Sequence, residues 1–306
     1  MKNYKLHTGL QEIYKITSKY DFEEKTGSDK NYRYVGDDGI TRGLAVCPSC
    51  DNPIRILGFY KKLDGRKPYA QHHNKSTNIA VFDKSAYLHC PNSNPGSKRQ
   101  WDKSSSKRQL SNYEKELYNI MRNNFDKVIS FLNNKLSLYI SCSTAERFLK
   151  EFVINSGCTN PDASIYNLPY ILLLTSSKFN VVKMRVKKHT KLWNFIYSRN
   201  INGIKLTSCH KLQDNIESNY DIIDVNCNKY ILLQCHFIKH VRYVNKEDEI
   251  IEKIEMRFSD SNKIPVNWIY KENISIDQES FPNYCKKINY GNKNLLEIAK
   301  KIMPPI

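Results

Sequence analysis

A group of cysteine and histidine residues near the N-terminus constrains the fold of this chain more than any other sequence feature. Residues 47–50 read Cys-Pro-Ser-Cys, and the pairs His72-His73 and His89-Cys90 follow in the same short segment. Structural zinc takes four sulfur or nitrogen ligands at roughly 2.0–2.3 Å in a tetrahedron, so two neighbouring thiolates need a second pair from elsewhere. Residues 40–95 are therefore predicted to fold into a small, strand-rich and turn-rich zinc module.

Strand alternation lets one member of each adjacent pair point at a common ion. We expect two hairpins, one presenting Cys47 and Cys50 and the other presenting His72 and Cys90, and these are the predicted zinc ligands. His73 is the alternative third ligand. Four protein ligands leave no open coordination position, so the predicted zinc is structural rather than catalytic.

The remaining sequence indicates reduced thiols and an intracellular setting. The chain has nine cysteines, an odd number, and its first residues lack the apolar stretch of a secretory signal. No run approaches the roughly 20 apolar residues of a membrane span. We therefore expect a soluble, cytoplasmic protein in which the other cysteines are small core residues.

The charge is strongly positive, and its distribution is uneven. The 306 residues carry 48 Lys and Arg against 31 Asp and Glu, a formal net charge of +17. Between Asp162 and Asp214 there is no acidic residue, whereas nine Lys and Arg fall in that stretch. Coding bias alone does not concentrate charge in this way, and such a balance bears on partners and not on fold. Nucleic acid is the expected partner, DNA rather than RNA, with a protein partner as the alternative and no membrane.

Two basic surfaces are the candidate contacts to phosphate. In residues 182–187 apolar and basic residues alternate, which predicts a strand with Lys183, Arg185 and Lys187 on one face, about 6.6–7 Å apart. Lys188 follows them, and Trp193, Phe195 and Tyr197 alternate further on, either as a stacking surface for bases or as the core side of a strand. A basic, Ser-rich linker over 96–110 adds Lys98, Arg99, Lys107 and Arg108.

The predicted fold class is α+β, with the following organisation. Residues 1–95 form an N-terminal region with the zinc module, 96–110 the linker, and 111–306 an α+β domain. That domain is expected to contain a helical pair over 111–155, a strand-rich part over 165–270 and a C-terminal helix over 294–303. The helices of the pair are predicted to begin with capping boxes, Ser111 with Glu114 and Ser143 with Glu146. A short helix capped by Thr8 and a buried strand over 169–174 complete the prediction.

The cysteine and histidine pattern also resembles a known family. The Cys-Pro-x-Cys turn, the segment 66–73 (Arg-Lys-Pro-Tyr-Ala-Gln-His-His) and the later Cys90-Pro91 resemble the N-terminal zinc module of competence CoiA-like proteins, over about residues 40–95. The resemblance implies a zinc-finger-like module in front of a restriction-type nuclease core. Tyr69 stands where the family often has its first histidine.

The nuclease core implied by that resemblance is not matched. The family needs an Asp at one strand end and a Glu-x-Gln or Glu-x-Lys on the next strand to hold Mg²⁺. The nearest match is Asp224, but Leu232 takes the position of the second carboxylate. Asp162 is another possible first acid, yet residues 171–174 offer it no partner.

The sequence thus predicts a zinc-containing nucleic-acid-binding protein that contacts phosphates through its basic strand and linker. One alternative is a Mg²⁺-dependent nuclease of the CoiA-like type, for which Asp224 is the weak catalytic candidate. The other is a non-catalytic interaction subunit of a multi-protein complex. There is no GxxxxGK[ST], GxGxxG or GxSxG motif, so nucleotide hydrolysis, serine-hydrolase chemistry and a small-molecule cofactor have no support. AT-biased composition associates the chain with a phage-defence or mobile-element setting.

Overall fold

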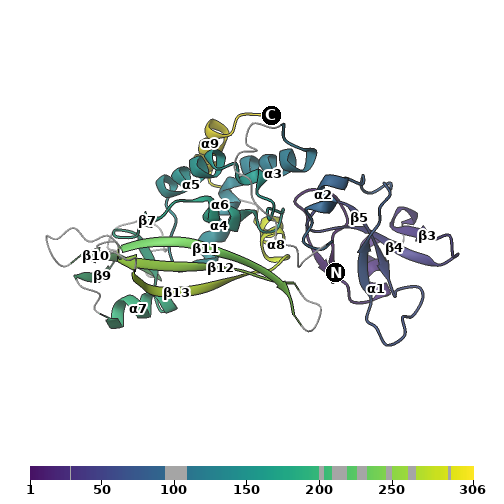
Figure 1. Ribbon diagram of the computed structural model, residues 1–306, viewed down its shortest axis with the longest axis horizontal. Helices are drawn as coiled ribbons and strands as arrows, with labels where there is room; N and C mark the ends of the chain where they lie inside the picture. The colour runs from purple at the N-terminus through teal and green to yellow at the C-terminus, as the bar shows by residue number, and fades with distance from the viewer. Residues whose placement is uncertain are drawn as a thin grey trace.

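The computed structural model describes residues 1–27, 29–93, 109–199, 203–208, 219–225, 233–245, 250–260, 267–288 and 291–306. It combines helices with antiparallel sheets, so the chain has the α+β fold that the sequence predicts. A smaller lobe of N-terminal residues lies beside a larger body of helices and sheet (Figure 1). Residues 94–108 lie outside the described residues. They include Lys98, Arg99, Lys107 and Arg108 of the predicted basic linker.

The N-terminal lobe is built on a four-stranded antiparallel sheet in the order β3-β4-β5-β6. The sheet buries Ala45, Ile54 and Ile56, which are almost completely shielded from solvent. Burial of such side chains is the main source of stability for a small module. The lobe contains β1 (Asn3–Tyr4), β2 (Tyr14–Lys15), α1 (Lys19–Thr26), the 3-10 turn η1 (Lys30–Tyr32), β3 (Arg33–Val35), β4 (Thr41–Val46), β5 (Pro53–Leu57), β6 (Tyr69–His72) and α2 (Lys84–Leu88).

The short helix predicted after Thr8 is wrong. Tyr14 belongs to β2, which pairs antiparallel with β1, and its ring lies 5.6 Å from that of Tyr4. The helix begins later, after Ser18, whose side-chain oxygen accepts a hydrogen bond from the Asp21 amide. A cross-strand aromatic pair and a better-placed N-cap outweigh the helical spacing of the apolar residues.

The helical layer of the larger body differs in detail from the predicted pair. The capping box of Ser111 and Glu114 is confirmed, but the first helix ends at Asn123 and a second begins at Phe125. Ser141, not Ser143, caps the next helix, because its hydroxyl oxygen accepts a hydrogen bond from the Thr144 amide. The layer contains α3 (Asn112–Asn123), α4 (Phe125–Lys135), α5 (Cys142–Ile154), η3 (Gly157–Thr159), α6 (Leu168–Thr175), α8 (Ser280–Lys287) and α9 (Lys293–Ile302).

The buried strand predicted over 169–174 is wrong, because this segment is helix α6. The prediction of burial is correct: Ile171, Leu172 and Leu173 are completely shielded from solvent. A helix that is apolar on all sides shows no periodicity and cannot be told from a core strand by pattern alone. Pro169 at the start of the helix fits the first turn, where its missing amide hydrogen is not needed. The predicted C-terminal helix is confirmed as α9, which buries Leu295 and Ala299.

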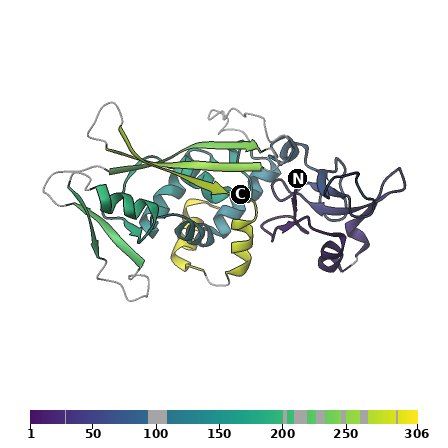
Figure 2. The same cartoon turned by 90° about the horizontal axis from the view of Figure 1, so that it is seen from below.

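The largest sheet is antiparallel, in the order β13-β12-β11-β7. Helices α4, α5 and α6 lie to one side of its long strands in both views (Figures 1 and 2). A bulge between Ile238 and Val241 shifts the register of β11 against β12. Its strands are β7 (Phe179–Asn180), β11 (Leu233–Val244), β12 (Ile250–Asp260) and β13 (Asn267–Ile276).

A second antiparallel sheet, β8-β10-β9, carries the basic segment. It consists of β8 (Arg185–Lys187), β10 (Tyr220–Val225) and β9 (Ile204–Ser208), and helix α7 (Lys191–Arg199) contacts β8 and β9. We call these four elements, with the turn before β8 and the turn between β8 and α7, the basic sheet. The predicted strand over 182–187 is therefore too long, since Lys183 has φ 71° and lies in a turn.

Candidate metal centre

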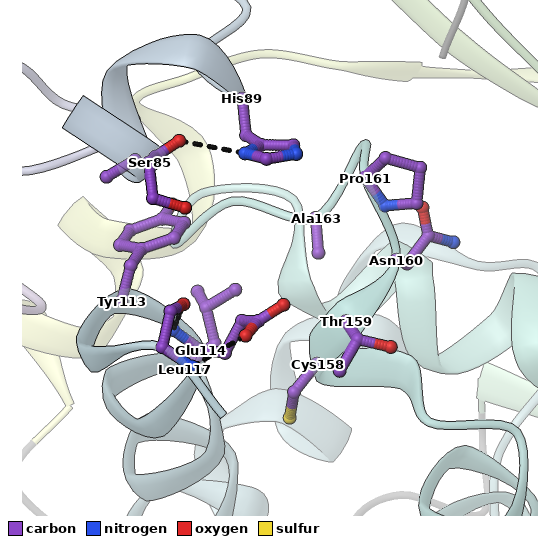
Figure 3. A pocket seen from close by; sticks show the side chains of 12 residues that line it. Ser85, His89, Tyr113, Glu114, Leu117, Cys158, Thr159, Asn160, Pro161 and Ala163 are labelled. Carbon is purple, nitrogen blue, oxygen red and sulfur yellow. Dashed lines mark hydrogen bonds between the residues drawn. The ribbon is translucent and has the colours of Figure 1, made fainter. Parts of the chain in front are cut away.

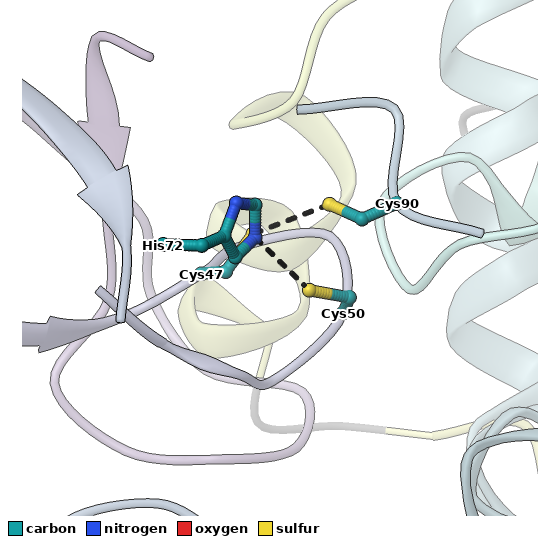
Figure 4. A group of neighbouring side chains, drawn as sticks. All are labelled: Cys47, Cys50, His72 and Cys90. Carbon is teal, nitrogen blue, oxygen red and sulfur yellow. Dashed lines mark hydrogen bonds between the residues drawn. The ribbon is translucent and has the colours of Figure 1, made fainter. Parts of the chain in front are cut away.

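The structure brings the four predicted zinc ligands together. The ligand atoms of Cys47, Cys50, His72 and Cys90 all lie within 4.8 Å of one another (Figure 4). The Sγ atoms of Cys47 and Cys90 are 3.6 Å apart, and Cys50 Sγ lies 3.4 Å from His72 Nε2. The group can hold a metal ion.

The Cys47–Cys90 and Cys50–His72 separations match the edges of a zinc tetrahedron. With zinc–sulfur and zinc–nitrogen bonds of about 2.3 and 2.05 Å, tetrahedral geometry places two sulfurs about 3.8 Å apart and a sulfur and nitrogen about 3.6 Å apart. Both measured distances lie within about 0.2 Å of those values. Three thiolates and one imidazole are a soft donor set that is consistent with structural zinc.

Each ligand is positioned by the end of a secondary-structure element. Cys47 follows β4, and the turn to β5 closes with a 2.8 Å hydrogen bond from the Cys47 amide to Asn52 O. This turn brings Cys50 back beside Cys47. His72 is the last residue of β6. Cys90 comes from the end of helix α2 rather than from a predicted hairpin, with its amide bonded to Tyr87 O.

Two asparagines that sequence analysis missed support the thiols. Asn52 Nδ2 lies 3.3 Å from Cys50 Sγ and also donates to Asp83 O. Asn92 Nδ2 lies 3.7 Å from Cys47 Sγ and donates to Ser49 Oγ. Amide donors to sulfur orient the ligands and stabilise thiolate charge. Each asparagine stands two residues after a ligand cysteine, and that spacing was the available signal.

Burial controls the ionisation of the three thiols. It raises the pKa of Cys50 and Cys90 well above the usual value. For Cys47 burial acts in the same direction, but hydrogen bonds from the other two thiols and the charge of His72 outweigh it and lower the pKa. Three buried thiolates repel one another, so full ionisation of this group requires a cation between them.

The other histidines of the segment, including the alternative third ligand His73, do not belong to this group. His73 is buried with its ring centroid 4.9 Å from that of Tyr34. His89 is exposed, and its Nδ1 lies 2.8 Å from Ser85 O. In Figure 3 it borders a cavity of about 40 Å³ between α2 and the helical layer. Such a volume holds a water molecule or so but no substrate.

The metal centre is attached to the larger body through buried polar contacts. The Tyr113 hydroxyl of α3 donates to Ser49 O, inside the Cys-Pro-Ser-Cys turn. Beside it, Lys5 forms an ion pair with Asp51, and burial together with the Asp51 charge raises the pKa of Glu116 to about 8. Neither contact had a sequence signal, because the partners are far apart along the chain.

The predicted nucleic-acid-binding residues are partly engaged in internal contacts. Lys183 pairs with Asp224, and Lys188 Nζ lies 3.5 Å from Asp221. Arg185 and Lys187 share one face of β8, where the Arg185 guanidinium lies 5.3 Å from the centre of the Tyr139 ring and Lys187 is exposed.

The aromatic residues predicted to alternate on a strand lie on helix α7 instead. Trp193 and Tyr197 are one helical turn apart and stack with centroids separated by 4.9 Å. Phe195 points elsewhere and packs against Tyr270 of β13. The prediction that all three rings share one face is therefore wrong.

The candidate acids of a nuclease are neutralised where the structure describes them. Asp224 carries the ion pair with Lys183, and this contact lowers its pKa. Asp162 lies beside Glu252, but Arg242 binds both carboxylates and His240 Nε2 lies 2.7 Å from Glu252. Leu232 lies outside the described residues. Arg242 and His240 thus lie against the Asp162 and Glu252 carboxylates.

Comparison with protein-family models, curated proteins and solved structures found no match, so the resemblance to CoiA-like proteins stays a prediction. None of the helices in the described part of the chain is both long enough and apolar enough to span a bilayer.

Proposed function

We propose that this chain is a nucleic-acid-binding protein whose zinc ion is structural. The donor set and spacing of the metal centre support zinc, and four protein ligands leave no position for a substrate or a water. The ion would hold the turn, strand β6 and the end of α2 together. It is assigned no chemical step.

The observation that carries nucleic-acid binding is the charge of the basic sheet. Its described residues contain only two acidic side chains, Asp221 and Asp224. They contain seven basic side chains: Lys183, Arg185, Lys187, Lys188, Lys191, Arg199 and Lys205. After internal pairing the sheet keeps an excess of positive charge, which a polyanion neutralises with release of its counterions.

The shape of this surface also supports the proposal. A groove of about 300 Å³ is lined by Trp193, Tyr197 and Lys205. Tyr197 is 71% exposed. Exposed rings next to cations are the elements from which backbone-tracking sites for single strands are built.

The test is a binding panel of single- and double-stranded DNA and RNA, at low and physiological salt, with and without Mg²⁺. The double variant Arg185→Gln, Lys187→Gln should reduce the slope of log K against log salt by about 1.4–1.8 if each residue contacts one phosphate. Lys300→Gln with Lys301→Gln, two exposed cations of α9, is the matched control. Denaturing gels of the same samples report whether the substrate stays intact.

Each other result has a clear meaning. An equal reduction of the salt slope in both double variants would show that net charge alone attracts nucleic acid. Fragments that require Mg²⁺ would favour the nuclease. No binding at low salt would overturn the proposal and leave the interaction subunit, whose partner would be an acidic protein.

A further inference from the structure

In the part of the chain that the structure describes, the helices of the body leave one face of the large sheet uncovered. Along β11, β12 and β13 the buried side chains point toward the helical layer, whereas the alternate positions point to the opposite side. In register across the three strands, His236, Arg257 and Lys271 form one row of that opposite side. We call this surface the open sheet face.

Aromatic rings and cations alternate on the open sheet face. Trp268 is 40% exposed and Tyr243 is 44% exposed. The Arg257 guanidinium lies 5.3 Å from the centre of the Trp268 ring, and Lys253 Nζ lies 6.0 Å from that of Tyr243. The His236 ring meets Trp268 edge to face at 4.9 Å. These contacts hold the rings in defined orientations while part of each remains open to solvent.

The charge of this face is positive. Four cations, Lys239, Lys253, Arg257 and Lys271, occupy outward positions on the described strands. Glu255 is the acid at an outward position there, and it already pairs with Arg257 and Lys271. The cores of protein–protein interfaces are depleted of lysine, so the three lysines of this face do not favour a protein partner.

We propose that the open sheet face binds single-stranded DNA, with unpaired bases stacking on Trp268 and Tyr243 and phosphates contacting the lysines. This inference rests on the proposed nucleic-acid binding and adds its substrate class. Rings on a flat sheet can stack on bases only when those bases are unpaired, as a base inside a duplex presents no free face. The residues that pair with the two rings, Ile251 and Ser259, are eight positions apart on β12, so the rings lie roughly 26 Å apart along the strands, enough for several nucleotides.

The contact between the basic sheet and the large sheet lies on the other face of the large sheet. Phe195 of α7 packs on Tyr270 of β13, with ring centroids 4.9 Å apart, and Tyr270 is in register with the buried Phe258. The open sheet face is therefore a separate surface from this contact.

The experiment measures the affinity of the full chain for a labelled oligothymidylate. Trp268→Leu removes the ring but keeps an apolar side chain, and should weaken binding by about 5- to 100-fold. Trp268→Phe should retain most of the affinity and lose the part of the fluorescence quenching that comes from Trp268, since the chain has three tryptophans. Lys271→Gln should reduce the salt slope by about 0.7.

The matched controls are exposed residues elsewhere: Tyr20→Leu on α1, where Tyr20 is 75% exposed, and Lys300→Gln on α9. Circular dichroism and thermal unfolding of each variant establish that it folds. Wild-type protein that binds no nucleic acid would overturn the proposed function itself. If wild-type protein binds but Trp268→Leu behaves as Tyr20→Leu does, the open sheet face is not the site and the proposed function stands. Tighter binding of duplex DNA, or of RNA of the same sequence, would overturn the assignment to single-stranded DNA.

Discussion

At the scale of single residues, the most unusual group of the larger body is a buried set of charges around Glu252. Its carboxylate receives hydrogen bonds from Arg242, His240, Tyr166 and Asn167. Asp162 supplies the second negative charge and Arg242 one of the positive charges. Buried charges are tolerated only when they are paired and fully hydrogen-bonded, as they are here.

The pKa values of this group predict how stability depends on pH. Burial alone would lower the pKa of His240, but the Asp162 and Glu252 carboxylates outweigh it and raise that pKa to about 9. Burial alone would raise the pKa of Glu252, but His240 and Arg242 lower it to about 2. The His240 contribution is fully present below the unfolded pKa near 6.5 and is lost as the pH rises through about 9. The Glu252 contribution is lost as the pH falls from about 4.5 through about 2.

We therefore expect the unfolding free energy of His240→Asn to fall less at alkaline pH than that of wild-type protein. Wild-type protein should lose of the order of 3 kcal/mol of unfolding free energy from this residue between pH 6.5 and 9.5, because one pKa unit corresponds to about 1.4 kcal/mol. Urea unfolding of both proteins across that range measures the difference. His7→Asn, outside this group, serves as the control. Parallel pH curves for His240→Asn and wild type would show that the imidazole does not carry the effect.

At the scale of elements, the N-cap residue determines where helix α5 begins. Ser141 accepts the Thr144 amide and so caps α5, whereas Ser143, at the second helical position, contacts only the Ser141 hydroxyl among the described hydrogen bonds. Capping satisfies an amide that has no partner inside the helix.

This difference predicts unequal effects for two neighbouring serines. Ser141→Ala should cost about 1 kcal/mol of unfolding free energy, in the range found for lost N-caps. Ser143→Ala should cost little, since serine has a lower helix propensity than alanine. Ser111→Ala, at the capping box of α3, supplies the reference. Chemical denaturation checks all three, and a larger loss for Ser143→Ala than for Ser141→Ala would restore the cap expected from the sequence pattern.

The bulge in β11 determines which way two members of the buried charge group around Glu252 point. Without the extra residue between Ile238 and Val241, strict alternation would turn His240 and Arg242 to the open sheet face. With it, both side chains point inward and meet Glu252. The same bulge leaves Lys239, with φ 54°, close to Glu255 on the outer side.

At the scale of the whole molecule, the metal centre couples the N-terminal lobe to the body. Its turn accepts the Tyr113 hydrogen bond, and Asn92, next to the centre, accepts one from Gln278 near the start of α8. Loss of the ion should therefore loosen both sides of this contact and not the lobe alone.

We expect about one zinc per chain in purified protein, and its removal by a chelator should raise hydrogen exchange in β4, β5 and the first turn of α3. Exchange in α9, which packs on α3, α4 and α5, should stay slow. Cys90→Ser should lose the metal and reproduce the exchange pattern, whereas Cys158→Ser, at a buried cysteine outside the centre, should keep it. Metal analysis that finds well under one zinc per chain, or a Cys158→Ser variant equally depleted, would contradict the assignment.

The amino-acid sequence by itself determined the features that depend on residue type and short spacing. The four ligands Cys47, Cys50, His72 and Cys90 follow from zinc chemistry, the Ser111 capping box from a four-residue pattern, and α9 from apolar periodicity. Tertiary structure alone decided that residues 168–175 are a helix, since an entirely apolar segment adopts whichever form its neighbours can cover. It also decided the direction of His240 and Arg242 and the supply of Cys90 from a helix end. These depend on register and on contacts between residues far apart in the chain, where no local pattern records which partner a side chain will meet.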